Sequence, residues 1–230
     1  MNKKKKIVIL TGAGISAESG INTFRDADGL WEGHDVMEVA SPAGWARNRE
    51  LVLDFYNQRR RQVLEVVPNA GHLALVELEK QYEVCIITQN VDDLHERAGS
   101  KRIVHLHGEL LKARSTVDDS LEYDWKKDIN IGDKCEKKSQ LRPAIVWFGE
   151  AVPMIEKAAD ITSIADILII IGTSMQVYPA AGLVHYVGDN VPIYFIDPRP
   201  SVNEKDIKNL KIVAENATTG VRKVVDELME

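Results

Sequence analysis

The chain has 230 residues, 44% of them hydrophobic and 28% charged, which is enough to bury the core of one sizeable domain with a smaller inserted lobe. The formal net charge of −6 argues against a dedicated nucleic-acid-binding protein, and the short run Lys3–Lys6 is typical of a solvated tail. Two cysteines, Cys85 and Cys135, are too few for a disulfide framework and favour a reducing compartment. The apolar block Ile7–Leu10 is too short for a signal peptide or a membrane span, so we expect a cytoplasmic protein without a membrane partner.

Short apolar runs rich in β-branched residues recur along the chain, and they do not alternate with polar residues, which is typical of strands buried on both faces. These runs are Ile7–Leu10, Val84–Ile87, Ile145–Phe148, Ile167–Ile171 and Ile193–Ile196. Helical patterns lie between them, one beginning after an Asn69 cap and one at Val221–Leu228. Strands that alternate with helices predict an α/β fold built on a Rossmann-like, doubly wound parallel sheet.

Two stretches interrupt this alternation. Residues 32–66 have a helical pattern, whereas residues 112–141 are polar and lack periodicity. We expect these two insertions to form a small lobe, and residues 1–31, 67–111 and 142–230 to form the large Rossmann-like lobe of a single domain.

A glycine-rich segment directly follows the first expected strand. The sequence Gly12-Ala13-Gly14-Ile15-Ser16-Ala17 matches the G-x-G-x-x-G/A fingerprint, in which glycines let the backbone approach a pyrophosphate. Glycine after a strand is also common in plain turns, but its position here favours a dinucleotide site. An ordinary dehydrogenase would continue into a second strand that ends in an acidic ribose ligand about 20 residues later. Since no such strand follows, the loop does not indicate a hydride-transfer enzyme.

The continuation of this loop, Ser19-Gly20-Ile21-Asn22-Thr23-Phe24-Arg25 and then Gly29-Leu30-Trp31, resembles the sirtuin family of NAD-dependent protein deacylases. Further blocks agree in order and spacing, namely Thr88–His95, His107–Leu110, Val146–Glu150 and Gly172–Ser174. The resemblance implies one catalytic domain that consumes NAD as a cosubstrate. It also implies that the products are nicotinamide, free lysine and O-acyl-ADP-ribose.

The resemblance assigns catalytic roles to Asn90, Asp92 and His107. Asn90 and Asp92 follow an expected strand, at the edge where open α/β sheets bind ligands, and in the family they hold the nicotinamide carboxamide and the adjacent ribose. The histidine before Gly-Glu-Leu is the family's general base, and its imidazole can accept a ribose hydroxyl proton near neutral pH. Taken alone, these residues would also fit a polar turn and a buried structural histidine. We expect structural roles for His95 and His105.

Further dinucleotide contacts are expected after two later strands. Gly172-Thr173-Ser174 offers glycine and hydroxyl groups to phosphates, although a strand-to-helix cap is an alternative. Asp197 can accept hydrogen bonds from the adenosine ribose. With the resemblance, the expected dinucleotide residues are Gly12, Ala13, Gly14, Ser16, Phe24, Arg25, Trp31, Gln89, Asn90, Val91, Asp92, Gly172, Thr173, Ser174, Asp197, Pro198, Arg199 and Ala217.

The acyl group is expected to contact a helix that contains Tyr56 and Arg59, which are three residues apart and share one face. A phenol hydroxyl and a guanidinium there would bind a carboxylate through charge-assisted hydrogen bonds. A solvated basic face also fits the Arg59-Arg60-Arg61 run. The pair resembles the sirtuin class that removes succinyl, malonyl or glutaryl groups. Acetyl-lysine remains an expected substrate because Ala17, at a small-residue position of the family, would leave the pocket roomy.

The partners implied by the resemblance are acyl-lysine proteins or peptides. Val146, Phe148 and Gly149 lie in a segment that pairs with the substrate backbone in the family, although its apolar residues could simply belong to the core. Backbone pairing recognises few side chains, so we expect loose peptide preference. We expect the protein to be a monomer.

The chain departs from the family's pattern at the structural zinc site. Most sirtuins have two Cys-x-x-Cys pairs after the His-Gly-Glu block, whereas this chain has only Cys135, with Ser115 and Lys138 as poor substitutes. One thiolate cannot form the tetrahedral site of a structural zinc, so we expect no metal. The lobe would then depend on packing by apolar side chains, which include Leu121, Tyr123, Trp125 and Ile129.

Two other functions share the same dinucleotide motifs. One is a catalytically weak NAD or ADP-ribose binding module, and the other is a protein ADP-ribosyltransferase. The presence of His107, Asn90 and Asp92 favours an enzyme over a binding module. Tyr56 and Arg59 favour deacylation over ADP-ribosyl transfer.

Overall fold

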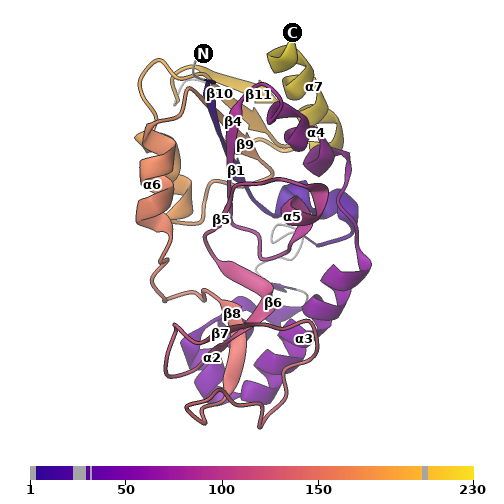
Figure 1. The fold of residues 1–230 in the computed structure, drawn as a ribbon, viewed down its shortest axis with the longest axis vertical. Coiled ribbons are helices and arrows are strands. Elements are labelled where there is room, and N and C mark those ends of the chain that lie inside the picture. Colours follow the sequence, from indigo (N-terminus) through magenta and orange to yellow (C-terminus); the bar gives the residue numbers. More distant parts are fainter. Residues whose placement is uncertain (1–3, 23–29, 32, 204–206) are drawn as a thin grey trace.

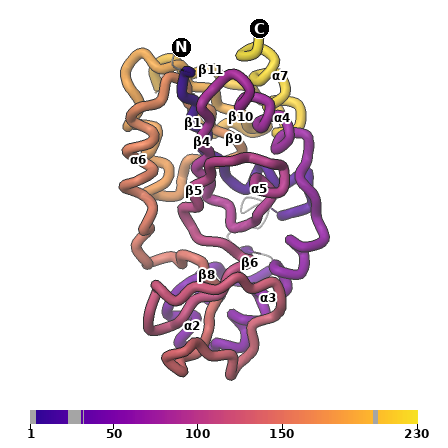
Figure 2. The backbone as a smooth tube through the Cα atoms, viewed as in Figure 1, coloured from indigo at the N-terminus to yellow at the C-terminus, as the bar shows by residue number. Residues whose placement is uncertain are grey.

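The computed structural model describes residues 4–22, 30–31, 33–203 and 207–230. Phe24 and Arg25, which the resemblance assigns to the dinucleotide site, lie outside the described residues. The chain forms two lobes, one built on a six-stranded sheet and the other on a three-stranded sheet (Figure 1). The tube in Figure 2 shows the three-stranded sheet and α3 (Arg49–Glu65) at the end of the molecule opposite the two termini.

The large lobe is organised by a parallel sheet with the strand order β11-β10-β9-β1-β4-β5. Its strands are β1 (Lys6–Thr11), β4 (Glu83–Thr88), β5 (Ile103–His105), β9 (Ile167–Ile171), β10 (Ile193–Ile196) and β11 (Leu210–Val213). The expected strands at β1, β4, β9 and β10 are confirmed. The apolar runs do not predict β5 and β11, which are short and occupy the two edges of the sheet.

Helices cover both faces of this sheet, so the doubly wound α/β fold is confirmed. Along β1, Ile7 and Ile9 pack into a core with α4 (Ala70–Leu78) and α7 (Ala217–Met229). Val8 and Leu10 point to the other face and pack with α6 (Ile155–Ser163) and a 3-10 helix, Ala180–Tyr186. Figure 1 shows α6 on one side of the sheet and α4 with α7 on the other. The short helix α5 (Leu94–Ala98) follows β4.

The small lobe combines helices with an antiparallel sheet of order β7-β6-β8. The strands are β6 (Gly108–Ser115), β7 (Glu122–Asp124) and β8 (Leu141–Ile145). The helices are α1 (Val36–Val39), α2 (Pro42–Arg47) and α3, and a two-stranded pair, β2 (Leu30–Trp31) with β3 (His34–Asp35), precedes them. A separate hydrophobic core joins these elements and contains Val52, Phe55, Tyr56, Leu141 and Trp147.

The expected parallel strand at Ile145–Phe148 is wrong. The strand β8 ends at Ile145, belongs to the antiparallel sheet, and is followed by Val146–Phe148 in a nonregular conformation. An apolar run shows that a segment is buried but not which sheet it joins. Both β6 and β8 also cross an expected lobe boundary, so we propose that residues 108–115 and 141–145 belong to the small lobe.

Apolar packing holds the part of the small lobe that contains Cys135. Ile129 is fully buried, and Leu121, Tyr123 and Trp125 pack against the same core, as the sequence analysis expects. The Cys135 thiol lies 3.4 Å from Ser115 Oγ and 3.3 Å from Ser139 Oγ. Among the described residues, no group of three or more His, Cys, Asp or Glu side chains is arranged to hold a metal ion. The expectation of a zinc-free lobe stays a prediction.

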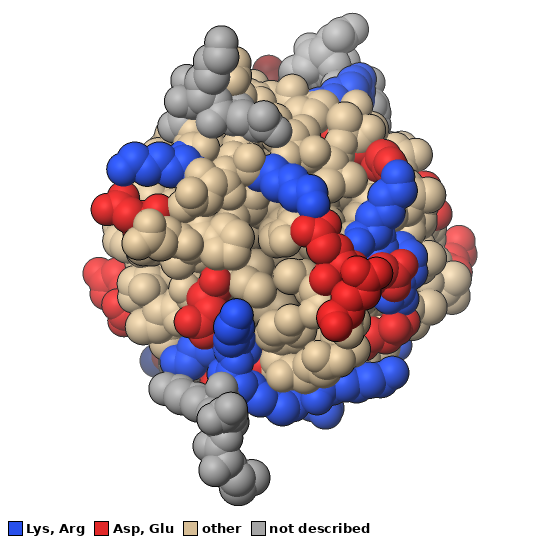
Figure 3. All heavy atoms as spheres, turned by 90° about the horizontal axis from the view of Figure 1, so that it is seen from above, with Lys and Arg blue, Asp and Glu red and all other residues tan. Residues whose placement is uncertain are grey.

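Charged side chains of both signs are mixed on the end of the molecule that has the two termini, as Figure 3 shows. Arg222 contacts Glu77 and Asp226, and Lys211 contacts Glu227. Such a mixed surface does not offer the continuous positive potential that would attract nucleic acid to this end of the molecule. Within the described part of the chain, no helix combines the length and apolar character needed to cross a membrane.

The first turn of α4 contains a buried histidine. Asn69 caps the helix by accepting a hydrogen bond from the Gly71 N–H at 2.9 Å, and His72 Nδ1 accepts one from the Asn69 N–H at 3.3 Å. His72 is fully buried, and its ring centroid lies 5.0 Å from that of the buried His95. Burial lowers the pKa of His72 to about 4, so this ring is neutral in the folded protein near neutral pH.

We expect this histidine to make the free energy of unfolding depend on pH. The unfolded chain takes up a proton at His72 near pH 6.5, whereas the folded chain does so only near pH 4. The contribution of neutral His72 to the free energy of unfolding is therefore complete above pH 6.5 and is lost as the pH falls from 6.5 to 4. The loss amounts to about 3 kcal/mol. Guanidinium unfolding at neutral and acidic pH measures it. His72→Gln keeps a capping-box acceptor and should show a smaller loss; an unchanged pH dependence would contradict the assignment.

Candidate functional site

Two adjoining cavities lie at the carboxyl ends of the parallel strands. The first has a volume of about 230 Å³ and the second about 340 Å³. The two cavities have a small part of their linings in common, namely Ala13, Gln89, Asn90, His107, Phe148 and Val177. The shared lining means that the two cavities adjoin along these residues, and His107 is the one titratable side chain among them.

The second cavity is built from the loops that follow β1, β9 and β10. Gly14 donates its N–H to the Gly172 carbonyl at 2.8 Å, and a Cβ added to Gly14 would lie only 2.5 Å from Gly172 Cα. Gly172 itself has a φ of +60°, which favours glycine. Residues from all three loops line this cavity, together with Ala217 at the start of α7: Gly12, Gly14, Ala17, Glu18, Thr173, Ser174, Asp197, Pro198 and Arg199. Close-packed glycines, hydroxyls and a carboxylate suit the phosphates and ribose of a dinucleotide.

A buried hydroxyl connects the two polar side chains that follow β4. Ser16 Oγ accepts a hydrogen bond from Asn90 Nδ2 at 3.2 Å and donates one to Asp92 Oδ2 at 3.0 Å. Asp92 Oδ1 also accepts the Leu94 N–H at 3.1 Å. Burial raises the pKa of Asp92, and the hydrogen bonds from Leu94 and Ser16 oppose that shift. The amide and the carboxylate are thus fixed relative to each other at the edge of the first cavity.

His105 and His107 contact neighbouring carbonyls of the loop after β4, but their pKa values shift in opposite directions. The His107 Nδ1 atom lies 3.1 Å from the Gln89 carbonyl, which can only accept, so the ring proton sits on Nδ1 and the lone pair of Nε2 stays available. Burial lowers the pKa of His107 and keeps the ring neutral. His105 places Nδ1 3.2 Å from the Asn90 carbonyl and Nε2 2.7 Å from a Glu96 oxygen. Burial alone would lower the pKa of His105, but its acidic partner Glu96 raises it overall.

The first cavity extends from His107 to α3. Tyr56 is fully buried and lines it, and its hydroxyl accepts a hydrogen bond from Trp147 Nε1 at 3.0 Å. Arg59 is half-buried and also lines it, with Nη1 donating to the Phe55 carbonyl at 2.8 Å and the guanidinium carbon 3.7 Å from the Phe55 ring centroid. A phenol and a guanidinium therefore share a cavity with the imidazole.

The model of the Sir2 family matches residues 12–179, a span that includes most of both cavity linings. The chain belongs to the Sir2 family. A relative from Helicobacter pylori strain 26695, named NAD-dependent protein deacylase, is 61% identical over 226 residues, which cover 98% of each chain. A relative of the same name from Bacteroides thetaiotaomicron is 53% identical, with 96% of each chain covered.

Solved Sir2 structures agree with this assignment. A crystal structure of a Sir2 homolog–NAD complex has a TM-score of 0.88 and 39% identity, with 99% of this chain and 90% of that chain covered. A structure of Sir2 bound to an acetylated peptide has a TM-score of 0.80 and 28% identity, with 99% and 95% covered. The family prediction from the sequence is therefore confirmed.

In this Sir2 protein the residues expected at the site divide between the two cavities. The second cavity is lined by Gly12, Gly14, Gly172, Thr173, Ser174, Asp197, Pro198, Arg199 and Ala217. The first is lined by Trp31, Tyr56, Arg59, Val91, Asp92, Val146 and Gly149. Ala13, Gln89, Asn90, His107 and Phe148 line both, and Ser16 lies buried beneath them.

Some residues lie in a different cavity from most others with the same expected role. Trp31, Val91 and Asp92, expected to contact the dinucleotide, line the first cavity and not the second, and their dinucleotide contacts stay a prediction. The Trp31 ring centroid lies 4.9 Å from that of Phe55. Ala17, expected to widen the acyl pocket, lines the second cavity instead. Proximity in sequence to the glycine loop does not determine which cavity a side chain enters.

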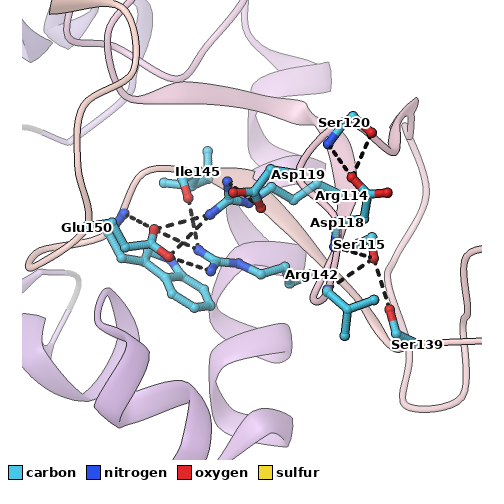
Figure 4. Close-up of polar contacts among 11 residues, drawn as sticks. Arg114, Ser115, Asp118, Asp119, Ser120, Ser139, Arg142, Ile145 and Glu150 are labelled. Atoms are coloured by element: carbon cyan, nitrogen blue, oxygen red, sulfur yellow. Dashed lines mark hydrogen bonds and ion pairs between the residues drawn. The ribbon is translucent and has the colours of Figure 1, made fainter. Parts of the chain in front are cut away.

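The sequence does not predict an ionic cluster at the wall of the first cavity, which Glu150 lines. Arg114 and Arg142 converge on the Glu150 carboxylate, as Figure 4 shows. Arg142 lies in the otherwise apolar strand β8, and a lone arginine in an apolar run is a signal of a buried ion pair that could have been used. The cluster touches Trp147, the hydrogen-bond donor to Tyr56.

Proposed function

We propose that this NAD-dependent protein deacylase removes succinyl, malonyl and related acidic acyl groups from lysine side chains, and acetyl groups less efficiently. The observation on which the proposal rests is that His107 lines both of the adjoining cavities. One cavity has the glycines and hydroxyls expected to contact the dinucleotide, and the other has Tyr56 and Arg59. The His107 imidazole would then lie next to both substrates, the dinucleotide in one cavity and the acyl-lysine in the other.

We assign the role of general base to His107. Its Nδ1–H donates to the Gln89 carbonyl, which orients the ring and leaves Nε2 to accept a proton from a ribose hydroxyl. When bound, NAD supplies that hydroxyl and the glycosidic bond whose cleavage releases nicotinamide. The low pKa of His107 keeps the accepting form populated near neutral pH.

Asn90 and Asp92 are assigned to hold the nicotinamide end of NAD. Their relative position is set by Ser16, which bonds to both side chains. A preorganised amide and carboxylate can stabilise charge that develops near the leaving group without reorganising during the reaction. We propose that Gly12, Gly14, Thr173, Ser174 and Asp197 bind the remainder of the dinucleotide.

The preference for acidic acyl groups rests on Arg59 and Tyr56. A guanidinium is charged at all physiological pH values, and burial raises the pKa of Tyr56, so its hydroxyl remains a proton donor. Both can donate to the terminal carboxylate of a succinyl group, whereas an acetyl group offers no carboxylate. Phe148 and Gly149, with Val146, are proposed to contact the substrate peptide along its backbone.

We further propose that the protein acts as a monomer in the cytoplasm, on protein substrates and without nucleic acid. Both cysteines of the chain are free and buried in the structure, which is compatible with a reducing compartment.

A direct assay tests the activity. Acetyl-lysine and succinyl-lysine versions of one peptide are incubated with the protein and NAD, and deacylated peptide, nicotinamide and O-acyl-ADP-ribose are followed by mass spectrometry. We expect all three products, with a higher kcat/KM for the succinyl peptide. A higher kcat/KM for the acetyl peptide would refute the acyl preference, and ADP-ribose attached to protein without loss of acyl groups would refute deacylation.

A further inference from the structure

The Tyr56 hydroxyl has a defined direction. It accepts the indole N–H of Trp147 at 3.0 Å, which is the hydrogen bond found for it among the described residues. Since one lone pair of the oxygen faces Trp147, the hydroxyl hydrogen must point elsewhere. Tyr56 lines the first cavity, so that hydrogen can be donated to a group bound there.

Trp147 is held in place from two sides. Its backbone N–H donates to Glu150 Oε2 at 2.8 Å, and the Arg142 guanidinium lies over its ring with the carbon 3.1 Å from the centroid. Trp147 is itself buried, with 2% of its surface exposed. The indole therefore cannot turn away from Tyr56 unless the contacts with Glu150 and Arg142 are disturbed.

The Glu150 carboxylate is clamped by two arginines (Figure 4). Arg142 Nη1 lies 2.7 Å from Oε1 and Nη2 lies 3.1 Å from Oε2, a bidentate pair, while Arg114 Nη2 lies 3.2 and 3.3 Å from the same oxygens. Burial alone would raise the pKa of Glu150, but the hydrogen bonds from Arg142 and Trp147 hold it below its usual range. A fixed anion of this kind orients the groups bonded to it.

We infer that Trp147 is a specificity-determining positioning residue, which orients the Tyr56 hydroxyl toward the acyl carboxylate, and that Glu150, clamped by Arg114 and Arg142, holds Trp147 in that role. The inference rests on the proposed preference for acidic acyl groups. It assigns the contact with the acyl carboxylate to Tyr56, and the orientation of that hydroxyl to Trp147 and Glu150, which line the same cavity.

The test is a double-mutant cycle with Trp147→Phe and Tyr56→Phe. Trp147→Phe keeps an aromatic ring but removes the indole N–H. We expect kcat/KM for the succinyl peptide to fall about five-fold, mainly through KM, and kcat/KM for the acetyl peptide to fall less. In the Tyr56→Phe background, Trp147→Phe should cause little further loss, because its effect acts through the missing hydroxyl. Calorimetric binding of the succinyl peptide without NAD should weaken in the same pattern.

The outcomes separate the inference from the proposed function. Suppose that wild-type protein prefers the succinyl peptide and that Tyr56→Phe reduces that preference. If Trp147→Phe then lowers kcat/KM equally for both peptides, or if its effect adds fully to that of Tyr56→Phe, the inference alone is overturned. If wild-type protein does not prefer the succinyl peptide, both the proposed acyl preference and this inference are overturned. Glu150→Gln provides a second variant should Trp147→Phe fail to fold. It should reduce the ratio of kcat/KM for the succinyl peptide to kcat/KM for the acetyl peptide, because it loosens Trp147. An unchanged ratio would also overturn the inference.

Discussion

His107→Ala is expected to lower kcat for deacylation by about 100-fold or more, because the substitution removes the proposed general base while leaving both cavities formed. His107 lines both cavities and bonds to the Gln89 carbonyl through Nδ1, and within the described part of the chain no hydrogen bond is found at its Nε2. Single-turnover kinetics with saturating peptide and NAD measures the effect on chemistry directly.

The pH profile adds an independent signature. Only neutral His107 can accept a proton, and burial lowers its pKa below 6.5, so the acid limb of kcat/KM should lie below pH 6.5. His185→Ala is a matched control, since His185 is exposed and lines neither cavity. A kcat for His107→Ala within a few-fold of wild type would remove His107 from the role of base.

Arg59→Met should lower kcat/KM for the succinyl peptide by about 10- to 100-fold, the range expected when a carboxylate loses a charged hydrogen-bond donor. The acetyl peptide offers Arg59 no carboxylate, so its kcat/KM should change far less. Steady-state kinetics on both peptides gives the ratio directly, and the ratio is insensitive to the fraction of active protein.

The same helix provides the control for this substitution. Arg61 is exposed, pairs with Asp128 at 2.6 Å and does not line the first cavity, so Arg61→Met should leave the ratio near the wild-type value. Equal losses on the two peptides in Arg59→Met would mean that Arg59 shapes the cavity rather than recognising the acyl carboxylate.

The central strands of the large lobe could be predicted because burial on both faces leaves a strong pattern. The run Ile167–Ile171, for example, is entirely buried, as its composition indicates. The edge strand β5 has only three residues and partly exposed ends, so its sequence differs little from a loop. The region 112–141 was not predicted as a sheet, because β7 is short and largely exposed.

The candidate site was predictable as a set of residues but not as a geometry. The motifs placed Gly14 and Gly172 in one group, although nothing in the sequence shows that their backbones touch. The roles of Arg142 and Glu150 escaped prediction for the same reason, since their partners lie on separate strands and turns. Long-range pairing of side chains depends on the packed tertiary structure, which local patterns do not specify.

The helix α3 explains how the proposed acyl contacts are kept in place. Tyr56 and Arg59 point into the first cavity, while the next residue along from each, Asn57 and Arg60, anchors the helix to the small lobe. Asn57 exchanges hydrogen bonds with the Ile129 backbone, both at 2.9 Å, and Arg60 Nε donates to the Leu110 carbonyl at 3.0 Å.

Because this anchoring fixes the helix backbone when the protein folds, the proposed acyl contacts would cost less backbone conformational entropy when the substrate binds. A shift of this helix would move Tyr56 and Arg59 together, so the two side chains would act as one unit in the proposed recognition. Acyl preference in this protein would thus be a property of how the small lobe folds as much as of the two side chains that meet the substrate.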